Sequence, residues 1–233
     1  MTLLASYSQT SFIIYLIALI SLLSLFTLIG PYFIRKYYHK TKTTGTQDKK
    51  DYLLLIHGIA IIFLGVGRLI LAIFDILTDF NSINYNLENF WIWKIGSSFQ
   101  MFALCLFFVL MEKRLLKGRD KYILVIFYLF FWILGMMMLD VVIATNFIII
   151  ATILTVYIPF AYLYIAIISE GRVRKKASYV FIGFAIFMVA ALLTGEIIID
   201  LIAIPLGITR IDVHIIAYTI KIICLLFFFL GLK

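Results

Sequence analysis

A lysine stands in the middle of the apolar stretch IAYTIKIICLL, residues 217–227, near the end of this chain. At the centre of a bilayer a lysine costs roughly 2.5–3.5 kcal/mol, so its presence there needs a reason. Because a helix turns about 100° per residue, His214 and Tyr218 share a helical face with Lys221, whereas Asp212 lies on the opposite face. Lipid would leave the three polar groups unsatisfied, and we therefore expect this face to point into the protein.

Two carboxylates lie in the preceding apolar run. Glu196 and Asp200 are four residues apart and share one helical face. Because the two apolar runs are joined by a short connection, a Glu196–Lys221 pair is the most economical way to neutralise the lysine. The pair has two interpretations: it belongs to a binding site, or it is a structural clamp between two helices.

Further polar groups occur in the second and third apolar runs. Arg68 and Asp75 are seven residues apart and share a face, and a guanidinium at this depth needs an acidic or carbonyl partner. Gln100 lies deep in the third run, whereas Lys94 is expected to anchor that run at the interface. The candidate site consists of these residues: Arg68, Asp75, Gln100, Glu196, Asp200, His214, Tyr218 and Lys221.

The positions of these residues predict a polar layer in the outer half of a membrane protein. The layer is expected to line a cavity that opens to the outside and binds a small ligand or an ion, or carries protons. Apart from His57, the inner half is nearly all Leu, Ile and Phe. This pattern favours a receptor-like cup over a continuous water-filled pore.

The elements that position the layer follow from composition. The chain of 233 residues is 64% hydrophobic, has a mean hydropathy of +1.12 and is only 14% charged, against roughly 25% in an ordinary soluble domain. Its apolar runs approach the ~20 residues that a helix needs to cross the hydrocarbon core. We predict an all-α integral membrane bundle, one domain over residues 1–233, with seven transmembrane helices: 11–34, 52–78, 90–112, 122–140, 145–169, 179–204 and 210–232.

The basic residues predict the orientation of this bundle. Every Lys and Arg lies in 35–51, in 113–121, in 172–176 or at Lys233, except Arg68, Lys94, Arg210 and Lys221. Since cytoplasmic loops are enriched in Lys and Arg, the N-terminus is predicted outside and the C-terminus in the cytoplasm. Membrane topology thus accounts for the net charge of +8 without a nucleic-acid partner.

A faint internal similarity suggests a parallel repeat. HGIAIIF at 57–63 and IGFAIFM at 182–188 begin the second and sixth predicted helices, and the same offset places Asp75 opposite Asp200. The similarity suggests two groups of three helices joined by the fourth, an arrangement known in some transporters. Chance similarity in so restricted an alphabet is the alternative.

Motifs for several enzyme classes are absent from the sequence. The three histidines stand apart without an HxxxH pattern, and neither a GxSxG motif nor a phosphate-binding loop occurs. Both cysteines, Cys105 and Cys224, lie inside apolar runs and say nothing about the redox compartment. We therefore expect a protein that is not an enzyme and has neither a metal site nor a resident cofactor.

The lysine in the last predicted helix resembles the retinal-binding lysine of microbial rhodopsins. WIWKIGSS, residues 91–98, is similar to the start of the third rhodopsin helix, with Lys94 where an arginine is usual. Ser97 and Ala217 stand where that family has carboxylates, and the sixth predicted helix lacks the family's Trp and Pro. This resemblance implies retinal as a Schiff base on Lys221, with Glu196 as the substitute counterion.

A second resemblance concerns SEGRVRKKASYVFIGFAIF, residues 169–187. This segment is similar to the basic turn and sixth helix of the seven-helix input modules of prokaryotic sensors such as histidine kinases. The resemblance implies sensing at the outer face and signalling through a separate cytoplasmic partner.

The sequence therefore favours a receptor- or sensor-like protein of the cell membrane that binds a small ligand or ion. The alternatives are an ion or proton transporter, a retinal-binding protein and a passive structural membrane protein.

Overall fold

The computed structural model describes residues 8–44, 52–80, 87–113, 122–194 and 196–233, apart from some side chains within these ranges that include those of Glu196 and Asp200. In this part of the chain 91% of the residues are helical and none forms a strand. The all-helical prediction is thus confirmed. The helices have the following bounds: α1 Gln9–Thr44, α2 Tyr52–Leu77, α3 Leu87–Met111, α4 Ile123–Met137, α5 Val141–Leu154, α6 Tyr157–Ile168, α7 Gly171–Leu193, α8 Glu196–Leu206 and α9 Arg210–Leu232.

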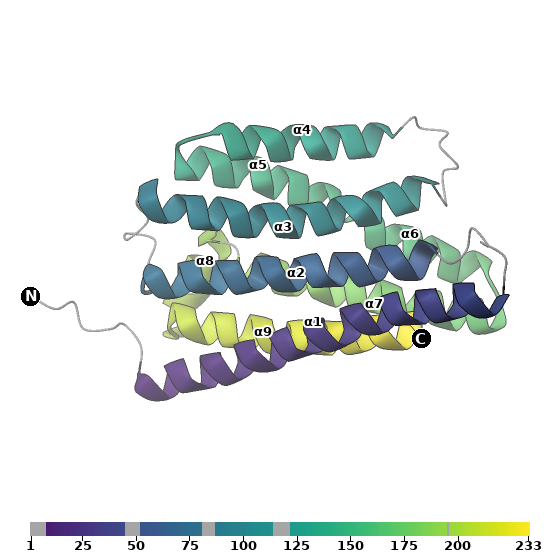
Figure 1. Ribbon diagram of the computed structural model, residues 1–233. Helices are drawn as coiled ribbons and strands as arrows, with labels where there is room; N and C mark the ends of the chain where they lie inside the picture. Colours follow the sequence, from purple (N-terminus) through teal and green to yellow (C-terminus); the bar gives the residue numbers. More distant parts are fainter. Residues whose placement is uncertain (1–7, 45–51, 81–86, 114–121, 195) are drawn as a thin grey trace, which may run out of the picture.

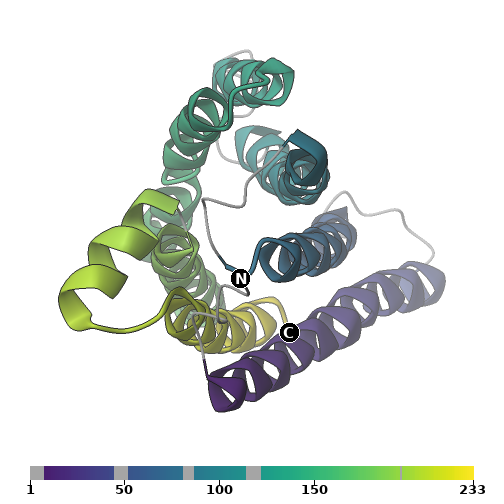
Figure 2. The same ribbon diagram turned by 90° about the vertical axis from the view of Figure 1, so that its left-hand side faces the viewer.

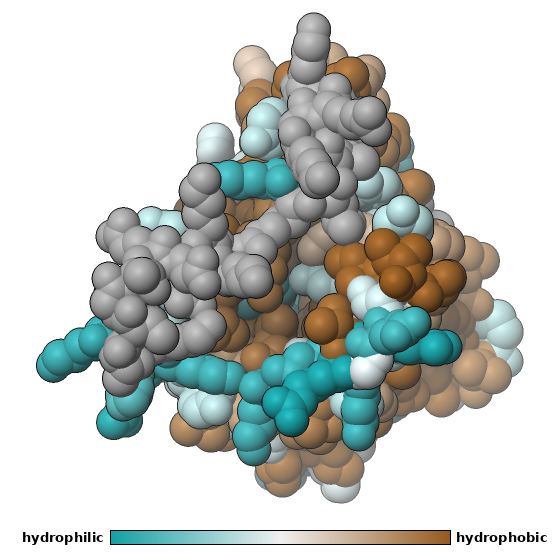
Figure 3. Space-filling model, turned by 90° about the vertical axis from the view of Figure 1, so that its right-hand side faces the viewer, coloured by the Kyte–Doolittle hydropathy of each residue, from teal (hydrophilic) through white to brown (hydrophobic). Residues whose placement is uncertain are grey.

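Most of these helices run along one common direction, whereas α8 leans away from the others at one end (Figures 1 and 2). We call this end, where α1 begins and α9 begins, the α8 end. The opposite end, where α1 and α9 finish and α7 starts, is the basic end, because it carries Arg35, Arg172 and Lys233. Figure 3 looks onto the basic end and shows hydrophilic side chains gathered there. The predicted orientation would make this end cytoplasmic.

Six helical stretches in the described chain are long and apolar enough to cross a membrane. The protein is therefore a multi-pass membrane protein. The stretches overlap six of the seven predicted spans: Gln9–His39, Tyr52–Leu77, Asn89–Met111, Ile143–Ile168, Gly171–Leu193 and Arg210–Leu232. The remaining apolar helix is Ile123–Met137, whose 15 residues reach only about 22 Å.

The fourth predicted span, 122–140, is shortened by a tight connection to α5. The side chain of Asp140 accepts a hydrogen bond from the backbone nitrogen of Ile143 at 2.9 Å and so caps the start of α5. Lys94 donates to the carbonyl oxygens of Met136 and Met138 at 2.9 and 2.6 Å, which satisfies carbonyls at the end of α4. The prediction that Lys94 is only an interfacial anchor was thus incomplete, since this lysine is 4% exposed and joins α3 to α4.

The predicted span 145–169 is interrupted between α5 and α6. The Thr152 hydroxyl donates to the Ile148 carbonyl at 2.8 Å, and the Thr155 hydroxyl donates to the Thr152 carbonyl at 2.6 Å. Such bonds compete with the helical ladder, and Pro159 has no N–H to contribute to it. The chain consequently forms a turn at Thr155 and Val156 before α6 begins.

The predicted span 179–204 was wrong as a single helix. Helix α7 ends at Leu193 and a separate helix, α8, starts at Glu196. At the break the Thr194 hydroxyl donates to the Ala191 carbonyl at 2.9 Å, and the next residue in the sequence is Gly195, a poor helix former. Glu196 and Asp200 therefore belong to a short helix outside the long span on which they were predicted.

The basic segments are more helical than predicted. Helix α1 continues to Thr44, well beyond the predicted boundary at residue 34, and α7 already begins at Gly171. Lys36 on α1 donates to the backbone oxygen of Lys233 at 2.8 Å. The end of α9 is thus tied to α1 at the basic end.

Glycines let neighbouring helices approach closely. A Cβ atom on Gly58 of α2 would lie 2.8 Å from the carbonyl oxygen of Gly30 on α1, and one on Gly67 would lie 2.8 Å from that of Gly96 on α3. Small residues at such contacts are typical of membrane bundles. Gly183 of α7 instead faces Phe228 on α9. Gly58 and Gly183, which the suggested repeat equates, thus pack against a preceding and a following helix, and their contacts do not support the repeat.

Candidate functional site

A cavity of about 310 Å³ lies inside the bundle, in the half near the α8 end. Helices α2, α3, α5, α7 and α9 contribute its walls, together with Phe26 of α1 and the turn between α5 and α6. Ligand cavities usually measure roughly 300–1,000 Å³, so this volume suits a small ligand. Most of the wall is apolar, and its ionisable groups are Arg68, Asp75, His214 and Lys221.

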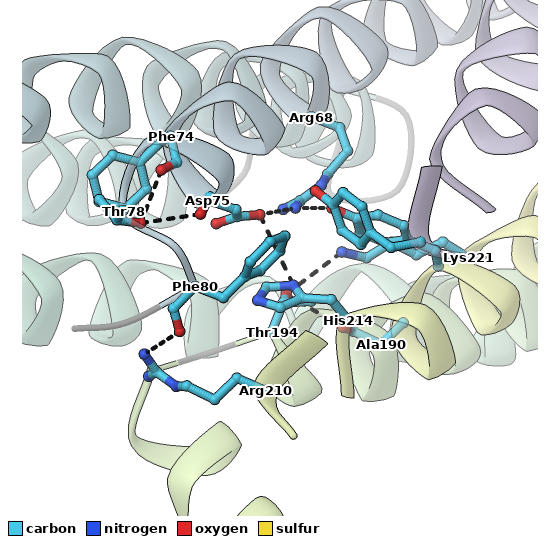
Figure 4. A network of polar contacts seen from close by, with 12 residues as sticks. Arg68, Phe74, Asp75, Thr78, Phe80, Ala190, Thr194, Arg210, His214 and Lys221 are labelled. Carbon is cyan, nitrogen blue, oxygen red and sulfur yellow. Dashed lines mark hydrogen bonds and ion pairs between the residues drawn. The ribbon is translucent and has the colours of Figure 1, made fainter. Parts of the chain in front are cut away.

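Arg68 is the centre of a polar network that joins three helices (Figure 4). Its guanidinium donates to the Asp75 carboxylate on one side and to the Tyr218 hydroxyl on the other. Tyr218 and Tyr15 share a hydrogen bond of 3.1 Å between their hydroxyl oxygens. The guanidinium carbon also lies 4.6 Å from the centre of the Tyr218 ring, within the range of a cation–π contact. Arg68 is only 4% exposed, so these contacts compensate its burial.

His214 lies beside this network without completing it. Its Nδ1 atom is 4.0 Å from the Asp75 carboxylate, which is beyond hydrogen-bond distance. The imidazole packs edge-on against the rings of Tyr15 and Phe80, with ring centres 6.5 and 5.6 Å away. Aromatic packing therefore fixes the ring, while its Nδ1 atom has no hydrogen-bond partner among the described residues.

Lys221 lines the cavity and has one weak hydrogen bond among the described residues. Its amine donates to the Thr194 hydroxyl at 3.5 Å, and the amine nitrogen lies 5.9 Å from the centre of the Tyr218 ring. Among the described side chains no carboxylate lies within 4.0 Å of this amine. The predicted Glu196–Lys221 pair involves a side chain outside the described part of the structure, and it stays a prediction.

The structure brings together most of the predicted site. Arg68, Asp75, Gln100, His214 and Lys221 line one cavity. Tyr218 is completely buried next to it and bonds Arg68, so the predicted shared face of His214, Tyr218 and Lys221 is confirmed.

Three further acids belong to the last two apolar runs of the sequence: Glu196, Asp200 and Asp212. Asp212 accepts hydrogen bonds from the backbone nitrogen and the hydroxyl of Thr209 at 3.0 and 2.5 Å and so belongs to the cap of α9. This position agrees with the prediction that Asp212 lies on the helical face opposite Lys221. Glu196 is the first residue of α8, and Asp200 follows on the same short helix. Their side chains lie outside the described residues, so their predicted part in the site is a matter for experiment.

The sequence analysis missed Tyr15 and the threonines of the cavity. Thr145, Thr152, Thr155 and Thr194 line the wall, and Tyr15 supports the network from behind. The only signal was their polarity inside long apolar runs. Helical rotation relates residues within one helix, but it does not tell which other helix stands opposite.

The polar groups of the cavity form a surplus of hydrogen-bond donors. Arg68 and Lys221 provide two basic side chains, whereas Asp75 is the only carboxylate among the described lining residues. Arg68 Nε and His214 Nδ1 are buried without a hydrogen-bond partner. The described residues include no group of three or more His, Cys, Asp and Glu side chains able to hold a metal ion. The arrangement thus suits an acceptor-rich or negatively charged ligand.

Aromatic side chains close the bundle between the cavity and the basic end. The Phe184 ring contacts those of Phe107, Tyr162 and Phe228, with ring centres 5.0, 5.8 and 4.7 Å away. His57 links two helices here, because its Nδ1 donates to the Leu53 carbonyl at 2.7 Å and its Nε2 accepts from the Tyr162 hydroxyl at 3.0 Å. All hydrogen-bonding atoms of this imidazole are satisfied, and the layer is part of the main hydrophobic core.

Comparisons with known proteins give no relative on which to base a function. No protein family model, curated protein or solved structure matches this chain.

Proposed function

We propose that this protein is a receptor- or sensor-like protein of the cell membrane whose cavity binds a small ligand or ion entering from the α8 end. The observation that carries the proposal is the asymmetry of the bundle. Near the α8 end lies a cavity of about 310 Å³ with incompletely bonded charged groups. Towards the basic end, packed aromatic rings occupy the same interior.

The two helix interruptions support a binding role for the cavity. Thr155 at the turn after α5 and Thr194 at the end of α7 both line its wall. Non-helical backbone at membrane depth is tolerated where protein or a cavity surrounds it, and broken helices often form binding sites in membrane proteins. A ligand at these breaks can change how α7 meets α8.

Helices α7 and α9 connect the cavity to the basic end. Helix α7 ends next to Thr194 of the cavity wall, and α9 carries His214 and Lys221. The two helices pack closely, since a Cβ atom on Gly231 would lie 3.0 Å from the Lys176 carbonyl oxygen. A ligand that moves one helix will therefore move the other. Under the predicted orientation this movement reaches a separate cytoplasmic signalling partner at the basic end.

The experiment compares two substitutions on α7. Ala191→Phe fills the cavity, whereas Val189→Phe adds the same ring at a position that is 53% exposed and does not line the cavity. Thermal unfolding of the purified protein is measured against a library of small ligands. We expect stabilising ligands to act on the native protein and on Val189→Phe, and to lose their effect on Ala191→Phe. Equal stabilisation of all three proteins would place binding elsewhere and refute the proposed site.

Retinal binding is the second candidate function, because Lys221 lines a cavity and has no described carboxylate partner. Protein purified from cells supplied with all-trans retinal should then show a visible absorption band that Lys221→Ala abolishes. Proton or ion transport in the same cavity should appear as a pH-dye signal in proteoliposomes that Glu196→Gln removes. A missing band eliminates the retinal version, and an unchanged flux eliminates the role of Glu196.

A further inference from the structure

We infer that the ligand of this cavity is an organic monoanion, a carboxylate carried by a compact apolar body. This inference rests on the proposed function and names the ligand class of the same site. Its starting point is the contrast between the polar end of the cavity, where donors exceed acceptors, and the apolar wall around the rest of it.

Among the described residues of the wall, one basic side chain has no acidic partner. Arg68 is neutralised by Asp75, whose carboxylate accepts from the guanidinium. Lys221 is 6% exposed and has only the Thr194 hydroxyl at 3.5 Å as a hydrogen-bond partner. An ammonium buried in this way needs a negative charge. A monoanion beside Lys221 would balance the described charges of the cavity, whereas a dianion would leave an excess of negative charge.

Two further nitrogen atoms beside the cavity have no hydrogen-bond partner among the described residues. Besides the Lys221 amine, Arg68 Nε and His214 Nδ1 are buried without partners, and both side chains line the cavity. Each of the three side chains is more than nine-tenths buried. Two carboxylate oxygens can accept from such donors, whereas a cationic ligand would find Asp75 already engaged by Arg68.

The rest of the wall specifies the body of the ligand. Leu64, Leu71, Leu104, Ile148 and Phe187 provide apolar surface to the same cavity. A halide ion would bury none of this surface, whereas an aromatic or short aliphatic group would gain about 25 cal/mol for each Å² removed from water. The cavity volume excludes a large ligand such as an intact phospholipid.

The test uses three probes with one body and different charges: 4-bromobenzoate, 4-bromobenzyl alcohol and 4-bromobenzylamine. Bromine quenches tryptophan fluorescence at contact distance, and Trp93 lines the cavity. The chain of 233 residues has three tryptophans, so the double substitution Trp91→Phe and Trp132→Phe leaves Trp93 as its only reporter. Neither replaced residue lines the cavity. Titration in detergent micelles gives an affinity for each probe.

We expect 4-bromobenzoate to bind at least about tenfold more tightly than the alcohol, and the amine to bind most weakly. Lys221→Met should weaken benzoate binding by about 10- to 100-fold, the value of a charge-assisted hydrogen bond, and leave alcohol binding nearly unchanged. Retained alcohol binding also shows that the variant is folded. Lys221→Arg should preserve most of the preference for the anion.

The matched control is Lys94→Met, a substitution of another buried lysine that bonds the Met136 and Met138 carbonyls outside the cavity. It should leave the ratio of benzoate to alcohol affinities unchanged. Equal affinities for all three probes, or a preference for the amine, would overturn the inference while keeping the cavity as a binding site. Absence of quenching by every probe would contradict both the inference and the proposed function.

The variant Glu196→Gln tests whether the Glu196 carboxylate already neutralises Lys221. If Glu196 already neutralises Lys221, the anion preference will emerge only in Glu196→Gln, and the inference is wrong for the native protein. If the cavity is built for an anion, the native protein prefers benzoate, and Glu196→Gln leaves that preference unchanged or increases it.

Discussion

The ion pair between Arg68 and Asp75 offers the sharpest test of the packing inside the bundle. We predict that Asp75→Asn destabilises the protein by about 3 kcal/mol. At contact distance and an effective dielectric constant near 20, the attraction of a charge pair is about 4 kcal/mol or more, and the amide keeps a neutral hydrogen bond worth about 1 kcal/mol. The loss agrees with the ~3–5 kcal/mol observed when one partner of a buried pair is removed.

The assay is thermal unfolding combined with a double-mutant cycle. For a chain of this length the loss corresponds to a fall in Tm of roughly 6–12 °C. Arg68→Met removes the other charge and retains the apolar stem. The double variant Arg68→Met/Asp75→Asn should be more stable than the sum of the two losses by about 1.5 kcal/mol or more, because it leaves no unpaired charge.

Asp140→Asn provides the control for this cycle. Asp140 caps α5 through a single hydrogen bond to Ile143, and asparagine caps a helix equally well, so the change should cost less than about 0.5 kcal/mol. The reasoning would be refuted by a loss below about 1 kcal/mol for Asp75→Asn, the level of ordinary interhelical hydrogen bonds in membranes. Additive losses in the cycle would likewise show that the two charges do not depend on each other.

Three further substitutions test separate contacts. Tyr15→Phe removes the hydrogen bond to Tyr218 and should cost about 0.5–1.5 kcal/mol in thermal unfolding. Gly58→Ala places a methyl group 2.8 Å from the Gly30 carbonyl oxygen and should cost about 1–3 kcal/mol in the same measurement. Lys94→Met frees two carbonyls at the end of α4, and hydrogen exchange should show faster opening of α4 with little change in α9.

Matched controls separate these contacts from general damage. Tyr164→Phe changes a tyrosine that is 57% exposed and should not alter stability, so an equal loss would contradict the importance of the Tyr15 contact. Gly183→Ala brings its new methyl group 3.0 Å from the ring of Phe228, and the nearest backbone atom, the Cys224 carbonyl oxygen, is 3.4 Å away. It should cost less than Gly58→Ala, and the reverse order would disprove the close approach of α1 and α2.

Patterns within one helix predicted which polar side chains share a helical face. The apolar runs indicated a multi-pass helical protein, which the six long apolar helices confirm. Helical rotation correctly grouped His214, Tyr218 and Lys221 and separated Asp212, because only angles along one regular helix were needed. The same arithmetic placed Arg68 and Asp75 on one face, where they form an ion pair.

Patterns within one helix could not predict contacts between helices or the places where a helix is interrupted. Tyr15 lies more than 200 residues before Tyr218 in the sequence, and nothing in either apolar run indicates that the two hydroxyls meet. The ends of α5 and α7 depend on hydroxyl groups of Thr155 and Thr194 that bond nearby carbonyls, whereas apolar content alone predicts an uninterrupted helix. The short helix α8 was missed for this reason.

The central claim is that a cavity beside Lys221 is accessible from the α8 end and closed towards the basic end. Its most direct measurement is labelling of Thr194→Cys by a membrane-impermeant, negatively charged thiol reagent, in a protein with Cys105 and Cys224 replaced by alanine. Ala190→Cys, at a completely buried position outside the cavity wall, is the unreactive control. The account predicts labelling of Thr194→Cys from the outer side of the membrane alone. Labelling from the cytoplasmic side, or equal protection of both cysteines, would contradict it.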